Sequence, residues 1–529
     1  MTTSKTFSAI SVLLFAFVFL PFTGIAQSYT ISGKITGLAD TTIYLANYYG
    51  NKLYYNDTSR VDSKGMYSFK GKPFNECGKY ALVLPGSKVI EFIAAEEPIV
   101  IDCSADADIG KIAVRKSENN RLFYEFVRYI NDKRKLREPI DVCLADSLKS
   151  DADKESCRSA LKKLNDEVIA YQKNLIARNP DLLISKFIRM SMEVETPEAP
   201  AELSGDEAAK WKYYWYRTHY WDNCDLTDPR LVRDQQFHRL VDTYINRTLP
   251  MIPDTMCVEA KKLIDRTGNN QDAFKYIVHF ITYFSETSKV MCMDRVFVYM
   301  VDNYYAKGRA TWMKEDKITE MKKSADEKRY CLCGEIAPDI ILPDMTGEKW
   351  VSMKKSTGKY TLLVIWESTC GHCKKEIPKL LDLYHKWKDK GLVVYAIGND
   401  LENDKWIKFV QENNLDWINV SDTPEIMKQD SASKLIWGGI TTLQSLNYRT
   451  TWDVNSTPKV YLMDKDMKII AKQLSAEQLD ELIQRMESGE KVNMENMQSH
   501  EYEDEDEAPK QPGKSQMKLR NSQPPKPKQ

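Results

Sequence analysis

Residues 366–378 are Trp-Glu-Ser-Thr-Cys-Gly-His-Cys-Lys-Lys-Glu-Ile-Pro, in which two residues separate a pair of cysteines. An apolar run at 362–366 precedes the pair, and apolar side chains follow at helical spacing over 374–388. This order predicts a buried strand followed by a helix that the cysteine pair opens, with Cys370 at the helix N-terminus. Because the free N–H groups and the dipole at a helix start stabilise an anion, this position favours the thiolate form of Cys370.

A cysteine pair in this setting can exchange thiols and disulfides with other proteins. We expect Cys370 to attack and Cys373, one turn further along and more buried, to resolve the mixed disulfide. A protonated His372 would stabilise the Cys370 thiolate and make the disulfide more oxidising. Zinc binding by these three residues is the alternative, but the chain has no second C-x-x-C or paired histidine at metal spacing. We therefore expect no metal, and no cofactor beyond a redox-active Cys370–Cys373 disulfide.

The sequence around the cysteine pair alternates between strand and helix patterns over 334–488. A strand is predicted at 392–397, a helix at 404–413, and a hairpin at 460–463 and 468–470. Ser475 and Gln478 have the spacing of a capping box at the start of a last helix, 475–488. These elements predict an α/β domain.

The segment 366–378 resembles the active-site segment of the TlpA/ResA-like branch of the thioredoxin superfamily. Residues 334–342 (Gly-Glu-Ile-Ala-Pro-Asp-Ile-Ile-Leu) and Ser456-Thr457-Pro458 are also similar to that branch. The resemblance implies a thioredoxin fold over 334–488, a proton relay through Glu376, and a cis proline at 458 that shapes a substrate groove. The predicted site residues are Cys370, Cys373 and Glu376 for catalysis, His372 and Gly371 for redox tuning, and Thr457, Pro458 and Trp366 for the groove.

Two features depart from that branch. Ser368-Thr369 replace the aromatic or small residues usual before the first cysteine. Residues 422–452 exceed what the core fold needs, and we expect them to form a lid or a partner-specific loop. The P-x-x-x-[ST]-x-x-C arrangement of peroxiredoxins is absent around either cysteine.

The N-terminus has the layout of a secretory signal peptide. Lys5 supplies a positive charge, 7–22 are almost wholly apolar, and Gly24-Ile25-Ala26 offers small residues for cleavage before Gln27. An uncleaved membrane anchor is the alternative. Both place the rest of the chain outside the cytoplasm, and we expect a periplasmic protein.

Two further domains are predicted between the signal peptide and the α/β domain. Residues 27–116 contain short β-rich runs separated by turns, which predicts a small antiparallel β-sandwich. Residues 117–333 have helical periodicity and predict an all-α domain. Within it, 210–221 hold seven aromatic residues on nearly all faces, which favours a buried helix over a ring-lined groove. Residues 489–529, with an acidic run at 501–507, predict a disordered tail.

The chain has 11 cysteines, most of them scattered singly, and we expect these to be small buried apolar residues. Cys331-Leu332-Cys333 is too tight for an easy bridge between its own cysteines, and we interpret it as structural.

A length of 529 residues is enough for roughly three domains. Hydrophobic and charged fractions of 42% and 29% are typical of a globular protein, and a net charge of −1 gives no basic field that would attract nucleic acid. A β and a helical domain before a TlpA-like domain resemble a recurrent arrangement in envelope proteins of Gram-negative bacteria. We expect a thiol–disulfide oxidoreductase, favouring a reductase, that acts on protein thiols and disulfides and has a membrane electron donor or acceptor. An oxidase or isomerase of the same fold, and an envelope binding or scaffold protein, are the alternatives.

Overall fold

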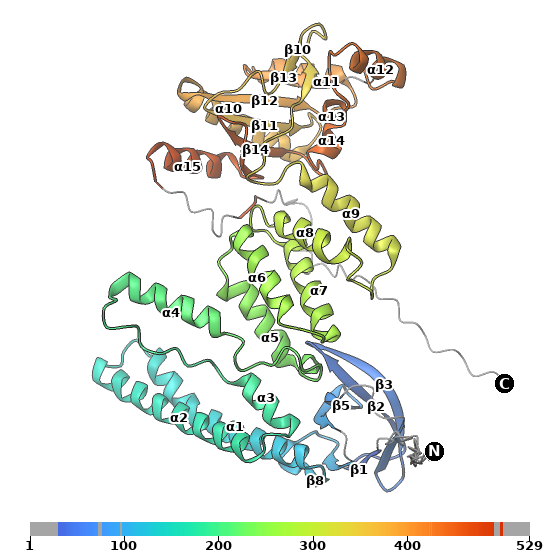
Figure 1. Cartoon of the computed structure of the whole chain (residues 1–529), viewed down its shortest axis with the longest axis vertical. Helices are drawn as coiled ribbons and strands as arrows, with labels where there is room; N and C mark the ends of the chain where they lie inside the picture. The colour runs from blue at the N-terminus through green and yellow to red at the C-terminus, as the bar shows by residue number, and fades with distance from the viewer. Residues whose placement is uncertain are drawn as a thin grey trace, which may run out of the picture. The chain divides into compact units, whose positions relative to one another are not determined.

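The computed structural model describes residues 30–71, 77–95, 98–422, 424, 426–490 and 498–500 (Figure 1). The predicted signal peptide and most of the predicted disordered tail lie outside these residues. Within them, no helix is both long and apolar enough to cross a bilayer. They divide into two compact units with a boundary between Thr243 and Tyr244, and Asn269–Ala273 return to the first unit. The helical region is therefore shared between the units, and each is described by itself.

The first unit begins with two four-stranded sheets around one core. One sheet has the order β4-β1-β7-β8 and the other β3-β2-β5-β6. Ile31 and Phe69 of the first sheet pack with Leu82 and Phe92 of the second, which confirms the predicted sandwich. One pair departs from the antiparallel prediction: β1 and β7 are parallel, because the chain passes through the other sheet before it returns beside β1. The strands are β1 Thr30–Thr36, β2 Thr41–Tyr49, β3 Lys52–Val61, β4 Met66–Lys70, β5 Gly78–Leu84, β6 Lys88–Ala94, β7 Ile99–Ser104 and β8 Ala113–Lys116.

Helices complete the first unit, as predicted from the periodicity after residue 117. Leu164 and Leu175 of the predicted apolar stripe are buried on α2. A disulfide joins Cys143 of α1 to Cys157 of α2, so these two cysteines are not the isolated apolar residues we expected. The helices are α1 Glu118–Ala145, α2 Asp151–Arg178, α3 Leu183–Ser191, α4 Gly205–His219 and α5 Gln235–Thr243.

The prediction that the aromatic helix is buried was wrong. Helix α4 has no buried residue, and Tyr214 is 55% exposed. Its rings contact neighbours on the helix itself instead of a core: Arg217 lies over the Tyr214 ring at 5.1 Å, and Trp215 stacks on His219 at 4.0 Å. Trp221, beyond the helix end, is buried.

The second unit combines helices with the predicted α/β domain. The helices before that domain are α6 Pro253–Asp265, α7 Gln271–Thr287, α8 Asp294–Met300 and α9 Glu315–Arg329. The sheet order β13-β12-β11-β14-β15 places β11 at its centre, parallel to β12 and antiparallel to β14. This is the thioredoxin-like arrangement that we predicted. Its strands are β9 Ile341–Pro343, β10 Trp350–Ser352, β11 Tyr360–Trp366, β12 Leu392–Gly398, β13 Ile418–Ser421, β14 Lys459–Asp464 and β15 Ile469–Lys472.

Both faces of the central sheet are covered. On one face, side chains of α10, α11 and α15 pack against Leu362 and Val364. On the other, Leu446, Tyr448 and Trp452 pack against the sheet, so the end of the 422–452 insertion belongs to the core of the domain. The helices are α10 Gly371–Trp387, α11 Asn403–Glu412, α12 Gln429–Trp437, α13 Leu443–Leu446, α14 Tyr448–Thr451 and α15 Ala476–Glu487, the last with the predicted capping box.

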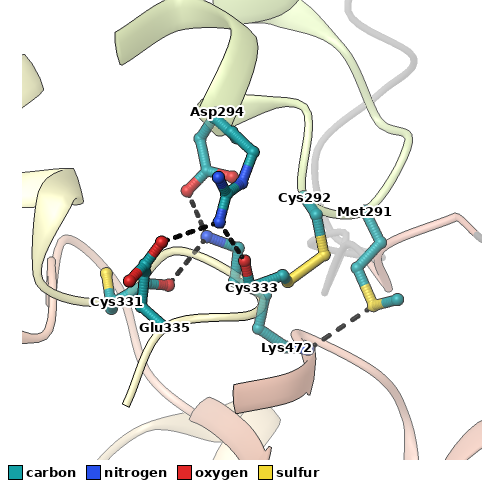
Figure 2. Close-up of a disulfide and its surroundings, with 8 residues drawn as sticks. Met291, Cys292, Asp294, Cys331, Cys333, Glu335 and Lys472 are labelled. Carbon is teal, nitrogen blue, oxygen red and sulfur yellow. Dashed lines mark hydrogen bonds and ion pairs between the residues drawn. A yellow bond between two sulfur atoms is a disulfide. The ribbon is translucent and has the colours of Figure 1, made fainter. Parts of the chain in front are cut away.

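A second disulfide joins Cys292 to Cys333, so these two cysteines are not the isolated apolar residues we expected (Figure 2). Cys331 is the buried thiol we expected, whereas Cys333 bonds to a cysteine 41 residues away that only the fold brings near. Met291 belongs to the same core as α10, and its sulfur accepts a hydrogen bond from Lys472 N at 3.4 Å. The core of the α/β domain therefore includes residues upstream of its predicted start at 334.

Candidate functional site

The cysteine motif lies where the central strand ends and α10 begins. All seven residues of β11 are buried, which fixes the position of the turn that follows. Ser368 N donates to the two Asp400 carboxylate oxygens at 3.1 and 3.0 Å, and Ser368 Oγ also donates to Asp400. The turn is thereby attached to the end of β12, the neighbouring strand.

The two cysteines have different environments. Cys370 is the N-cap residue of α10 and is partly exposed, whereas Cys373 is fully buried among the apolar side chains beneath the helix. Both are thiols in this structure. Burial raises the pKa of the Cys373 thiol well above its ordinary value, since a thiolate there would lose its hydration. Cys370 is therefore the thiol that an external sulfur can reach, and Cys373 is the thiol behind it.

The loop before β14 faces Cys370. The Thr457–Pro458 peptide bond is cis, and the Cys370 thiol donates to the Thr457 carbonyl oxygen at 3.3 Å. This contact brings together residues that are 87 positions apart in the sequence. Thr457, one of the predicted groove residues, thus lies against the predicted nucleophile, and Pro458 follows it across the cis bond.

Glu376 is buried on α10, with 3% of its surface exposed. Its Oε1 accepts a hydrogen bond from Ala476 N, the first residue of α15, at 2.7 Å, and Lys379 Nζ lies 3.8 Å from Oε2. A helix start stabilises a carboxylate in this way. The structure thus places Glu376 one turn beyond Cys373 in the interior, and not on the exposed helix surface.

The predicted tuning residues lie at the accessible start of α10. His372 is partly exposed and Gly371 is exposed. A Cβ atom added at Gly371 would meet nothing within 4 Å, so packing does not require a glycine there. If a small residue is required at position 371, the reason is space for a substrate that binds beside Cys370.

Trp366 does not line a groove, which corrects our prediction. It is 0% exposed and packs within the core, with its ring centroid 4.9 Å from that of Phe409. Because Trp366 is the last residue of a strand covered on both faces, its side chain points into the core and not toward the solvent near Cys370.

The sequence did not reveal a polar network that ties the insertion to the motif. Tyr448 Oη donates to Asn399 Oδ1 at 2.8 Å, and Asn399 Nδ2 donates to Glu367 Oε1 at 2.6 Å. Arg449 binds Asp422 through both of its terminal nitrogens. No motif marks these residues, because 422–452 meets the motif only through the fold.

A cavity of about 690 Å³ opens beside this network. Thr369, which precedes Cys370, lines it together with Leu401, Met427 and Arg449. Leu401, one of the few apolar residues in a mostly polar lining, is 87% exposed. Among the residues that the structure describes, no group of three His, Cys, Asp or Glu side chains could hold a metal ion.

The β-rich, helical and α/β regions of the chain each match a known protein family. Residues 333–472 match the AhpC/TSA family, residues 29–123 match DUF4369, and residues 150–330 match DUF5106, the last two being domains of unknown function.

Curated relatives match the part of the chain that carries the cysteine motif. The thiol-disulfide oxidoreductase ResA of Bacillus anthracis is 30% identical over 159 residues, which are 30% of this chain and 78% of the relative. A protein of the same name from Bacillus cereus is 28% identical over 163 residues, 30% of this chain and 82% of the relative. Among solved structures, a thioredoxin-like protein from Bacteroides caccae has 20% sequence identity and a TM-score of 0.40, over 55% of this chain and 98% of that one.

Proposed function

Since this chain belongs to the ResA-like thiol–disulfide oxidoreductases, we propose that it reduces disulfides in other proteins outside the cytoplasm, with Cys370 as the attacking thiol and Cys373 as the resolving thiol. The observation that carries the proposal is the contrast between the two cysteines. An accessible thiol lies at a helix start, and a buried thiol with a raised pKa lies one turn behind it.

The proposed reaction transfers two electrons in two exchange steps. The Cys370 thiolate attacks one sulfur of a substrate disulfide, that S–S bond breaks, and the first substrate thiolate leaves. Cys373 then loses its proton and attacks the Cys370 sulfur, which releases the second substrate thiolate and leaves a Cys370–Cys373 disulfide. An external thiol donor must reduce this disulfide before the next cycle, and we propose a membrane-bound one.

Neighbouring residues support these steps. The proton of Cys373 has to cross an apolar interior, and the buried carboxylate of Glu376 is the group we propose to accept it. An extended substrate chain can pair with the backbone at Thr457, next to the reacting sulfur.

Trapping tests the proposal directly. The Cys373→Ala variant should hold substrates as mixed disulfides on Cys370, which mass spectrometry can identify, whereas Cys370→Ser should trap nothing. In an insulin-reduction assay with dithiothreitol, Cys370→Ser should be inactive. If Cys370→Ser reduces insulin as fast as the parent does, the assignment is wrong and an envelope binding role takes its place.

His372 favours a second candidate, either an oxidase that runs the same exchange in the other direction or an isomerase that rearranges disulfides without net oxidation. The imidazole is partly exposed two residues after Cys370, where its protonated form would stabilise the thiolate and thus the dithiol form. His372→Pro should then lower the reduction potential by some tens of millivolts, with 30 mV equivalent to about 1.4 kcal/mol. A parent potential near that of strong oxidants would favour this candidate over the reductase.

The proposed location outside the cytoplasm rests on the N-terminal sequence. N-terminal sequencing of the mature protein should give a start near Gln27. An intact Met1 on a protein recovered from the cytoplasm would contradict it.

A further inference from the structure

Asp453 lies between two lysines that come from distant parts of the chain. Lys328 Nζ, on α9, is 3.3 Å from both Asp453 carboxylate oxygens, and Lys459 Nζ, on β14, is 3.9 Å from Oδ2. The Asp453 and Lys459 side chains are only 16% and 7% exposed. With so little water around them, the charges interact more strongly than an ion pair on the surface.

Lys459 depends on Asp453 as its counter-charge. Among the described residues, Asp453 is the only carboxylate within 4.0 Å of Lys459 Nζ. Burial lowers the pKa of Lys459, and the charge of Asp453 opposes that shift. Removing the Asp453 charge would leave the buried Lys459 ammonium without its counter-charge, which destabilises the arrangement that joins the two residues.

Asp453 and Lys459 lie at the two ends of the loop, 453–459, that faces Cys370. Lys459 directly follows Pro458, and the preceding residue, Thr457, accepts the hydrogen bond from the Cys370 thiol. At the other end of the loop, Asp453 also accepts a hydrogen bond from Asn455 Nδ2 at 2.8 Å. The Asp453–Lys459 pair therefore connects the two ends of the 453–459 loop across its base.

We propose that Asp453 is a positioning residue for the loop that faces Cys370, and that α9 of the helical region acts on the active site by holding Asp453 through Lys328. The inference rests on the proposed function, because it explains how Thr457 is presented to a substrate. It also gives part of the helical region a role in the exchange reaction.

Loss of this anchor has two opposite consequences. If the loop relaxes, the backbone at Thr457 no longer meets a substrate chain in register, so protein substrates bind more weakly. The Cys370 thiol also loses the Thr457 carbonyl that lies against it, so its sulfur becomes more accessible and small alkylating reagents react faster.

The test uses the full-length protein with the variants Asp453→Asn and Lys328→Met. Lys323→Met is the matched control, since Lys323 lies on the same helix, is 79% exposed and pairs only loosely with Glu327 at 3.9 Å. For each variant, KM and kcat are measured with insulin and with a small-molecule disulfide, and the alkylation rate of Cys370 by iodoacetamide is followed by mass spectrometry at neutral pH.

We expect Asp453→Asn and Lys328→Met to raise KM for insulin by about threefold or more, with kcat for the small disulfide within about twofold of the parent. Alkylation of Cys370 should become faster in both variants, and Lys323→Met should change nothing. If Asp453→Asn does not fold, Lys328→Met decides alone, because it leaves the Asp453–Lys459 pair intact. Parent-like KM and alkylation rates in folded Lys328→Met would overturn the proposal.

Failure of the proposed function would look different. In that case the parent itself would not reduce insulin in a Cys370-dependent way, while the alkylation rates would still report on the loop.

Discussion

Removing the Cys292–Cys333 disulfide should destabilise the second unit without touching the reacting cysteines. The bond joins residues 41 positions apart. In the chain-entropy description, a closed loop of this length lowers the entropy of the unfolded chain by about 13 cal/mol/K, or about 4 kcal/mol at 25 °C. The double variant Cys292→Ala/Cys333→Ala should lose up to about that much free energy of unfolding.

Hydrogen exchange measured by mass spectrometry can locate this loss. Peptides from β11 and α10 belong to the core that includes Met291 and Cys292, so their protection should fall, whereas peptides from β5 in the first unit should keep theirs. The measurement is made without reductant, which would open the bond in the parent.

The other disulfide supplies the control. Cys143 and Cys157 are 14 positions apart, so Cys143→Ala/Cys157→Ala should cost about 3 kcal/mol and affect α1 and α2 instead. Unchanged protection of β11 in Cys292→Ala/Cys333→Ala, within about 0.5 kcal/mol, would refute the reasoning.

Three other predictions concern single side chains. Glu376→Gln keeps a hydrogen-bond acceptor for Ala476 N but removes the charge, so turnover should fall by about tenfold to a hundredfold with an altered pH–rate profile; a parent-like profile would exclude the proton relay. Because burial raises the pKa of Cys373, its contribution to the stability of the dithiol protein is complete below the ordinary thiol pKa of about 8.5 and is lost as pH rises above it. Urea titrations between neutral and alkaline pH should therefore show a steeper loss of stability for the parent than for Cys373→Ala, and equal slopes would contradict this. In the aromatic helix, single Trp→Phe variants should assign strong acrylamide quenching to Trp211 and Trp215, which are partly exposed, and little to the buried Trp221.

Local sequence patterns were sufficient to predict helices and strands whose formation depends on residues a few positions apart. The period of the apolar residues predicted α2, β11 and α10, and Ser475 with Gln478 predicted the start of α15. These features depend on neighbours within a few positions, for which side-chain spacing determines what can be buried.

The same rules failed where burial depends on distant partners. The density of rings on α4 suggested a buried helix, yet the rings contact one another and nearby cations on a half-exposed surface. Trp366 was assigned to the groove by resemblance, whereas the position of its strand within the sheet directs the ring into the core.

The sequence by itself determined the chemistry of this protein: a cysteine pair at a strand-to-helix turn, and therefore a thiol at a helix start with a second thiol one turn behind it. The resemblance of Ser456-Thr457-Pro458 also predicted the loop beside the cysteines, where Thr457 contacts Cys370. Only the tertiary structure decided two other contacts in this domain. Cys292 bonds to Cys333, 41 positions away, and Lys328 contacts Asp453, 125 positions away. Each of these contacts is made by side chains or backbone groups that carry no local signal, because their partners are selected by how the sheet and helices pack and not by spacing along the chain.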